Sequence, residues 1–222
     1  LELGAPEAQV YPELAFQTAV RAGMWLRRLD SSLVDGWIDR AMAVAPEGTP
    51  VRVRALAAKA MWYDELDTAR AALAAADELG DVELRSIGLG SVQWALEASG
   101  RFVEACEVAE VRIGLFPEIA DPDHLADALM LDAELYATVG RLAEARLMVA
   151  RLAETVAGLT PHHRVHGLVT HLRLEAAVAD WQAVRGLAQR AEDAVAANLT
   201  TPCPANVGAL LLAALGMVHL GD

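Results

Sequence analysis

Cysteine and aromatic residues are scarce in this chain. It has 222 residues, of which two are cysteines, Cys106 and Cys203, and 5% are aromatic. Two isolated cysteines provide neither a disulfide framework nor a metal-binding spacing, so we expect a reducing, cytoplasmic location. No stretch alternates β-branched or aromatic residues with polar ones, which argues against a β-sheet.

Long hydrophobic runs are missing as well. The longest apolar run covers residues 207–220 and includes His219, whereas a bilayer-spanning helix needs about 20 residues. We therefore expect no membrane span. The chain begins Leu1-Glu2-Leu3-Gly4, without a Met or a basic segment, so no signal peptide is predicted and we interpret the sequence as part of a longer polypeptide.

Basic residues are few relative to acidic ones. The chain has 18 Lys and Arg against 31 Asp and Glu, which gives a net charge of −13. Because phosphate groups are bound mainly through Lys and Arg, this balance disfavours nucleic acid or an anionic membrane as a direct partner. We interpret the negative charge as a contribution to solubility.

Small apolar residues and a recurring turn are abundant. Hydrophobic residues make up 55% of the chain, and much of that is alanine, which has the highest helix propensity, so we predict an all-α fold. Seven-residue segments beginning at Asp64, Gly100, Gly140 and Ala179 align without gaps, and a fifth copy begins at Gly221. The starts are 36, 40, 39 and 42 residues apart, a spacing typical of stacked helical hairpins.

Capping residues and helix breakers predict where the helices begin and end. We expect one repeat domain over residues 1–222, with about five helical hairpins and a final unpaired helix. Asp30 or Ser31 is the predicted N-cap of the second helix in the first hairpin. The predicted hairpins cover residues 12–45, 51–79, 83–115, 123–157 and 161–197, and the final helix covers residues 204–220.

Each predicted turn follows the same physical logic. Gly100 and Gly140 can adopt the left-handed conformation that ends the first helix of a hairpin. A large apolar residue follows two positions after the start of each turn, and we expect it in the core. A small residue follows three positions later and lets the paired helices approach each other. The large residues are Leu66, Phe102, Leu142 and Trp181, and the small ones are Ala69, Ala105, Ala145 and Val184.

These turns resemble those of the tetratricopeptide repeat family, over nearly the whole chain from about residue 15. Gly100 with Ala105, and Gly140 with Ala145, match the turn and second-helix positions of that family. The repeat periods exceed the family's usual length of about 34 residues, and the aromatic residue of the first helix is mostly missing. The resemblance implies a right-handed α-α superhelix, a solenoid with a concave groove.

Longer, degenerate repeats of this sort resemble the helical arrays of large bacterial regulators. In such proteins an ATPase or cyclase module, or a LuxR-type transcriptional output, accompanies a sensor array. Residues 194–222 are similar to part of such an array. The resemblance implies a non-catalytic interaction or sensor domain whose partner is a protein, another domain of the same polypeptide or a small effector.

The groove of a tetratricopeptide-like array is lined by the first helix of each hairpin. The polar residues on those helices here carry mixed charge, which suits a polar peptide or a partner helix. We select five of them as candidate binding residues: Arg85, Gln93, Glu134, His171 and Arg173. The others are Arg52, Lys59, Glu97, Asp127 and Glu175. A receptor that holds a small metabolite near His171 and Arg173 is the alternative function.

Other titratable clusters have structural explanations. His162 and His166 are spaced i,i+4 and are capable of sharing one metal ion, so a helical enzyme that uses them is a remote alternative. They lack the accompanying glutamate of a zinc-protease motif, and we interpret them as polar residues on an exposed helix, with no metal or cofactor assigned. Asp121 is the expected cap of a helix, and Cys203, between two prolines, is interpreted as a structural thiol.

The final predicted helix, 204–220, has no helix after it to complete a hairpin. One apolar face of this helix is therefore expected to be uncovered. We expect that face to be protected by self-association, as a homodimer, or to fray.

Overall fold

A computed structural model of the chain describes residues 32–201 and 203–221, and every regular element within those ranges is a helix. The all-α prediction is confirmed for this part of the chain. The chain divides into two compact units, one ending at Glu118 and the other beginning at Ile119. The single domain over residues 1–222 stays a prediction. Residues 12–31, including the proposed caps Asp30 and Ser31, lie outside the described residues.

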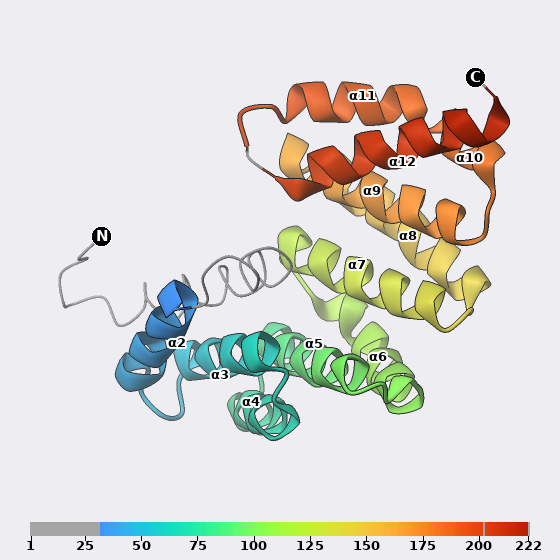
Figure 1. Ribbon diagram of the computed structural model, residues 1–222. Coiled ribbons are helices and arrows are strands. Elements are labelled where there is room, and N and C mark those ends of the chain that lie inside the picture. Colours follow the sequence, from blue (N-terminus) through green and yellow to red (C-terminus); the bar gives the residue numbers. More distant parts are fainter. Residues whose placement is uncertain (1–31, 202, 222) are drawn as a thin grey trace. The chain divides into compact units, whose positions relative to one another are not determined.

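The first unit is a series of helices that pack on their neighbours in sequence (Figure 1). Helix α4 packs on both α3 and α5, α3 also reaches α5, and α6 packs on α5, while α2 contacts α3. This is the contact pattern expected of consecutive hairpins. The elements are α2 (Ser32–Val44), α3 (Pro50–Tyr63), α4 (Leu66–Leu79), α5 (Val82–Ala98), α6 (Phe102–Leu115) and the 3₁₀-helix η2 (Phe116–Glu118).

The second unit follows the same rule. Helix α8 packs on α7 and α9, and α7 also contacts α9. Helix α12 packs on α9, α10 and α11 (Figure 1). The elements are α7 (Pro122–Thr138), α8 (Leu142–Ala157), α9 (Pro161–Ala177), α10 (Trp181–Gly186), α11 (Ala188–Ala197) and α12 (Pro204–Leu220). Both units are thus consistent with a repeat-like array.

Helix starts are fixed by proline and by acidic caps. Proline occupies the first turn of α3, α7, α9 and α12, where its missing N–H has no helical partner to lose. The Asp81 carboxylate accepts hydrogen bonds from the backbone N–H of Glu83 and Leu84 at 2.9 and 3.0 Å. Asp121 accepts one from Asp123 at 3.0 Å, which confirms its predicted role as a cap.

The recurring turn is one conformation, repeated. The first residue of each copy is left-handed, with φ of 74° at Gly100, 80° at Gly140 and Gly221, and 57° at Asp64 and Ala179. In the Gly100 copy, the N–H of the next residue bonds the carbonyl oxygen of Leu96 at 2.9 Å, which closes the end of α5. The left-handed prediction is confirmed at both glycines, and two non-glycine residues adopt the same conformation.

The predictions for the residues that follow each turn are confirmed for the small residues and only in part for the large ones. The four small residues Ala69, Ala105, Ala145 and Val184 are all fully buried, which confirms close approach of the paired helices. The large residues vary: Phe102 is 37% exposed, and Leu66 and Leu142 are half-buried. Trp181 is also half-buried, but it packs against the core of the second unit as predicted. Each is the first residue of its helix, so no preceding helical turn covers it.

The second helix of the predicted hairpin 161–197 is interrupted. Leu187 separates α10 from α11, and its N–H bonds the carbonyl oxygen of Val184, three residues back, at 3.1 Å. Gly186 immediately precedes the break, and glycine is a poor helix former because its backbone is so free. The interruption places Leu187 in the core, where it is 7% exposed.

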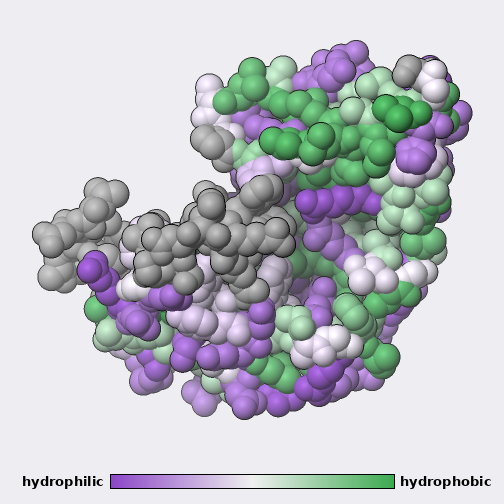
Figure 2. All heavy atoms as spheres, viewed as in Figure 1, coloured by the Kyte–Doolittle hydropathy of each residue, from purple (hydrophilic) through white to green (hydrophobic). Residues whose placement is uncertain are grey.

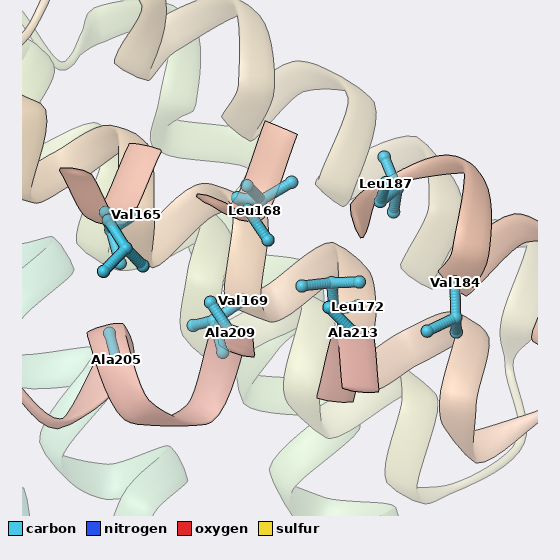
Figure 3. Packing of buried hydrophobic residues seen from close by; sticks show 11 residues of the cluster. Val165, Leu168, Val169, Leu172, Val184, Leu187, Ala205, Ala209 and Ala213 are labelled. Atoms are coloured by element: carbon cyan, nitrogen blue, oxygen red, sulfur yellow. The ribbon is translucent and has the colours of Figure 1, made fainter. Parts of the chain in front are cut away.

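Small residues on α12 pack against α9 in the core of the second unit. Ala205, Ala209 and Ala213 meet the face of α9 that carries Val165, Val169 and Leu172 (Figure 3). All six side chains are at most 7% exposed. Alanine allows the two helix axes to approach closely, so the sequence of α12 fixes one of its faces against α9. No helix among the described residues is long and apolar enough to span a bilayer.

Candidate functional site

The five candidate binding residues are divided between the two units. Arg85 and Gln93 belong to α5 in the first unit, and Glu134, His171 and Arg173 belong to α7 and α9 in the second. Arg85 pairs with Asp77 of α4, with Nε and Oδ1 3.0 Å apart. Gln93 is only 1% exposed, and its amide donates to Glu97 at 3.0 Å. Gln93 is therefore a core side chain in the described part of the chain, and not the groove residue that the sequence suggests.

Glu134 and Arg173 do come together, across α7 and α9. The guanidinium Nη1 of Arg173 lies 2.7 Å from Oε1 of Glu134, and both side chains are partly exposed. They border a cleft of about 260 Å³. Its other lining residues come from α7, α8 and α9 and are mostly small or apolar: Ala133, Ala137, Thr138, Val149, Thr170, Leu174 and Ala177.

His171 belongs to a separate charge network on α9. The Glu175 carboxylate, 6% exposed, accepts hydrogen bonds from Arg146 at 2.8 and 3.2 Å and lies 3.6 Å from His171 Nε2. The pKa of His171 is lowered, chiefly because burial disfavours the imidazolium, and the attraction of Glu175 offsets only part of this effect. The buried carboxylate is paired, so this network stabilises the contact between α8 and α9.

The helix α12 carries an apolar face that nothing in the described chain covers. Five large apolar side chains on it are exposed by 41 to 71%. They are Val207, Leu210, Leu211, Leu215 and Val218. Figure 2 shows apolar side chains gathered over α12, and the helix has no Asp, Glu, Lys or Arg along its 17 residues. We call these five residues the α12 face. The predicted uncovered face is confirmed for the described residues.

The register of the repeats shows what this face corresponds to. The residue eleven positions before each turn residue is Leu89, Leu129 or Leu168 on α5, α7 and α9, and these leucines are at most 7% exposed. The same position on α12 is Leu210, which is 41% exposed. A position that is buried in three helices of equal length is therefore open in the fourth.

The hairpin α5–α6 shows what covers two neighbouring positions of this register on α5. Arg112 of α6 donates from Nε to the Ser86 hydroxyl at 3.3 Å, and its guanidinium lies 3.1 Å from where a Cβ on Gly90 would stand. Ser86 and Gly90 correspond to Val207 and Leu211 on α12, which are 56 and 64% exposed. Val207 and Leu211 of the α12 face are thus in the register that α6 covers on α5.

Two histidines on α9 lie close to a cysteine that the sequence did not connect with them. His162 and His166 lie on one side of the helix with ring centroids 4.6 Å apart. Cys203, 37 residues later, brings its sulfur to 3.2 Å from Nε2 of His166. No local spacing connects a cysteine between two prolines with these histidines, because the approach depends on how α12 packs on α9. These three residues are able to hold a metal ion.

Comparisons with protein-family models, with curated protein sequences and with solved structures each found no match to this chain.

Proposed function

We propose that this chain is a non-catalytic protein-interaction domain that binds an amphipathic helix of a partner protein on the α12 face. The observation that carries the proposal is the register of that face. Val207 and Leu211 stand where α5 contacts α6, yet they are exposed by 56 and 64%. Exposed apolar surface of this extent on one helix is a feature of interaction sites.

The chemistry of the face defines the partner. Where α5 offers Ser86 and Gly90 to an arginine, α12 offers Val207 and Leu211, so the incoming helix needs apolar side chains at those contacts. Because α12 contains no Asp, Glu, Lys or Arg, the affinity for the partner helix is expected to depend little on the salt concentration. A common recognition mode places an amphipathic helix in an apolar groove, with its anchoring side chains at positions i, i+3, i+4 and i+7.

The resemblance to tetratricopeptide arrays supports the wider setting. Helices that pack on their sequence neighbours are consistent with a repeat-like array, and the left-handed turns at Gly100 and Gly140 occur at the positions that resemble the turns of that family. We propose a right-handed superhelical array that serves as the interaction or sensor part of a cytoplasmic bacterial regulator. Binding of the partner helix would bias the packing of the last hairpin and so the activity of the regulator.

A peptide from the chain itself is the most direct probe. Helix α8 packs on α7, whose residues Ala126 and Met130 occupy the register of Val207 and Leu211. A fluorescent peptide with the sequence of residues 142–157 is therefore expected to bind the intact chain, measured by fluorescence anisotropy. Leu211→Asp should weaken binding at least about tenfold, because it places a charge in an apolar contact.

The matched control is Val111→Asp on α6, a residue that is 50% exposed and outside the α12 face. It should leave the affinity for the peptide unchanged. Equal affinity of the wild type and Leu211→Asp would refute the proposal. Sedimentation velocity adds the second readout: a wild-type dimer that Leu211→Asp dissociates would assign the α12 face to a second copy of this chain and overturn the choice of a partner protein.

The cleft between α7 and α9 supports a second candidate function, a receptor for a small zwitterion. Arg173 and Glu134 would separate to bind a carboxylate and an ammonium group above the apolar lining. The cleft's volume of about 260 Å³ is just below the range of about 300–1,000 Å³ that is typical of ligand sites. A thermal-shift screen with free amino acids tests this function, and Arg173→Ala should abolish any rise in melting temperature.

A further inference from the structure

Three metal-binding side chains converge where α9 meets the start of α12. His162 and His166 are one helical turn apart on α9, and Cys203 is the residue that precedes α12. One donor atom from each of the three lies within 4.8 Å of the other two, and all three residues are half-buried. Two of the donors, Nε2 of His166 and Sγ of Cys203, are 3.2 Å apart.

We propose that His162, His166 and Cys203 bind a zinc ion. Zinc prefers imidazole nitrogen and thiolate sulfur at about 2.0 and 2.3 Å, in a tetrahedron whose N···S edges are about 3.5 Å. The His166–Cys203 separation of 3.2 Å is within about 0.3 Å of such an edge. Small changes of side-chain rotamer bring the remaining donors from their present spread to that distance. On binding, the thiol proton of Cys203 is released to solvent and the sulfur binds as thiolate.

The surroundings of the site select these donors over their neighbours. His163, next to His162 in the sequence, contacts other partners. Its Nδ1 lies 2.8 Å from the Thr160 hydroxyl, and its Nε2 contacts the carboxylate of Asp123. Its ring stands at 82° to that of His162. The site therefore has two nitrogen donors and one sulfur donor, and the fourth position is left for water or an external ligand, as in zinc sites that are not closed.

Zinc at this position would add metal–ligand bonds to the packing and the His166–Cys203 contact that connect α9 with the start of α12. Downstream of Cys203, Ala205, Ala209 and Ala213 already pack on α9. The ion would fix the first turn of α12 to the first turns of α9, because its bonds to His162, His166 and Cys203 span both. This inference goes beyond the proposed function and does not depend on whether the α12 face binds a partner.

Cobalt(II) is the probe, since it occupies zinc sites and reports sulfur ligation by a charge-transfer band in the near ultraviolet. The full chain, reduced and freed of metal with a chelator, is titrated with cobalt chloride. We expect one Co²⁺ per chain, the sulfur-to-cobalt band, and its disappearance when Zn²⁺ is added, because zinc binds such sites more tightly. Zinc should also raise the melting temperature of the wild type.

Matched variants assign the donors. Cys203→Ser should abolish the band and, because even partners outside the ligand shell are worth about 10–100-fold in metal affinity, should weaken zinc binding by at least about 100-fold. His166→Asn should weaken zinc binding to a similar extent. Cys106→Ser and His163→Asn are the controls and should keep both the band and the affinity. Far-ultraviolet circular dichroism verifies that each variant is folded.

Three results would overturn the proposal. The first is the absence of a sulfur-to-cobalt band in the wild type at stoichiometric cobalt. The second is a band that persists in Cys203→Ser, and the third is a band that Cys106→Ser removes. Any of these would leave the three side chains as ordinary packing and hydrogen-bonding groups between α9 and the segment before α12.

Discussion

Gly88 lies where α5 packs closely on α4, and its replacement by alanine tests that packing directly. A Cβ at this position would stand 2.7 Å from the Cα of Leu73 and 3.1 Å from its backbone nitrogen. Both atoms belong to the backbone of α4, so no side chain can rotate away. Relief of the clash requires α4 and α5 to separate, which disturbs the apolar contacts around Ala72, Ala76 and Ile87.

The size of the effect follows from two opposing terms. Forcing one extra carbon into a tight contact costs about 1–3 kcal/mol, while replacing glycine by alanine within a helix gains about 0.8–1.0 kcal/mol. We expect Gly88→Ala to lower the free energy of unfolding by up to about 2 kcal/mol. Gly114, exposed near the end of α6, is the matched control because a Cβ there meets nothing within 4 Å. Gly114→Ala should stabilise the chain by about 0.5–1 kcal/mol.

Urea denaturation followed by far-ultraviolet circular dichroism measures both variants. The two alanine variants should move the midpoint in opposite directions and should differ in melting temperature by several degrees, at about 2–4 °C per kcal/mol for a chain of this size. A Gly88→Ala protein as stable as Gly114→Ala would refute the close approach of α4 and α5 at Gly88.

Two further predictions concern single charged groups. The pKa of His171 is lowered from its ordinary 6.5 by burial, so the unfolded chain binds a proton at this residue more readily than the folded chain does. The free energy of unfolding is therefore unaffected by this residue above about pH 6.5, and it decreases as the pH falls from there through the folded pKa. Urea midpoints measured from pH 8 to pH 5 should therefore fall less steeply in His171→Asn, and identical slopes would contradict the assignment. Asp81→Ala should cost about 1 kcal/mol by removing the cap of α5, whereas Asp81→Asn should be nearly neutral; equal losses would show that charge and not capping matters.

The sequence predicted the turns well because their cause is local. A left-handed residue at the end of a helix depends on a few consecutive residues, and the copies at Gly100, Gly140 and Gly221 all adopt it. The fully buried Ala69, Ala105 and Ala145 follow from the same periodicity. The helix ends set by Asp81 and Asp121 are equally local, since each carboxylate bonds N–H groups two or three residues away.

The candidate binding residues were harder to predict, because burial depends on neighbours distant in sequence. Gln93 and Glu134 both stand on first helices of hairpins and have polar side chains, yet Gln93 is 1% exposed and Glu134 borders a cleft. Phe102 shows the converse error, since its position after the turn suggested a core residue that is in fact 37% exposed. Periodicity gives the face of a helix, and it does not give what packs against that face.

The sequence by itself determined that this protein is helical, where most of its helices begin and end, and which turn is repeated, because these properties arise from interactions within a few residues. Only the tertiary structure decided that Cys203 meets His162 and His166 and that Glu134 meets Arg173. It also decided that Leu210 is open where Leu89, Leu129 and Leu168 are buried. Such contacts depend on how whole helices pack, and side chains that meet across them leave no signature in local spacing.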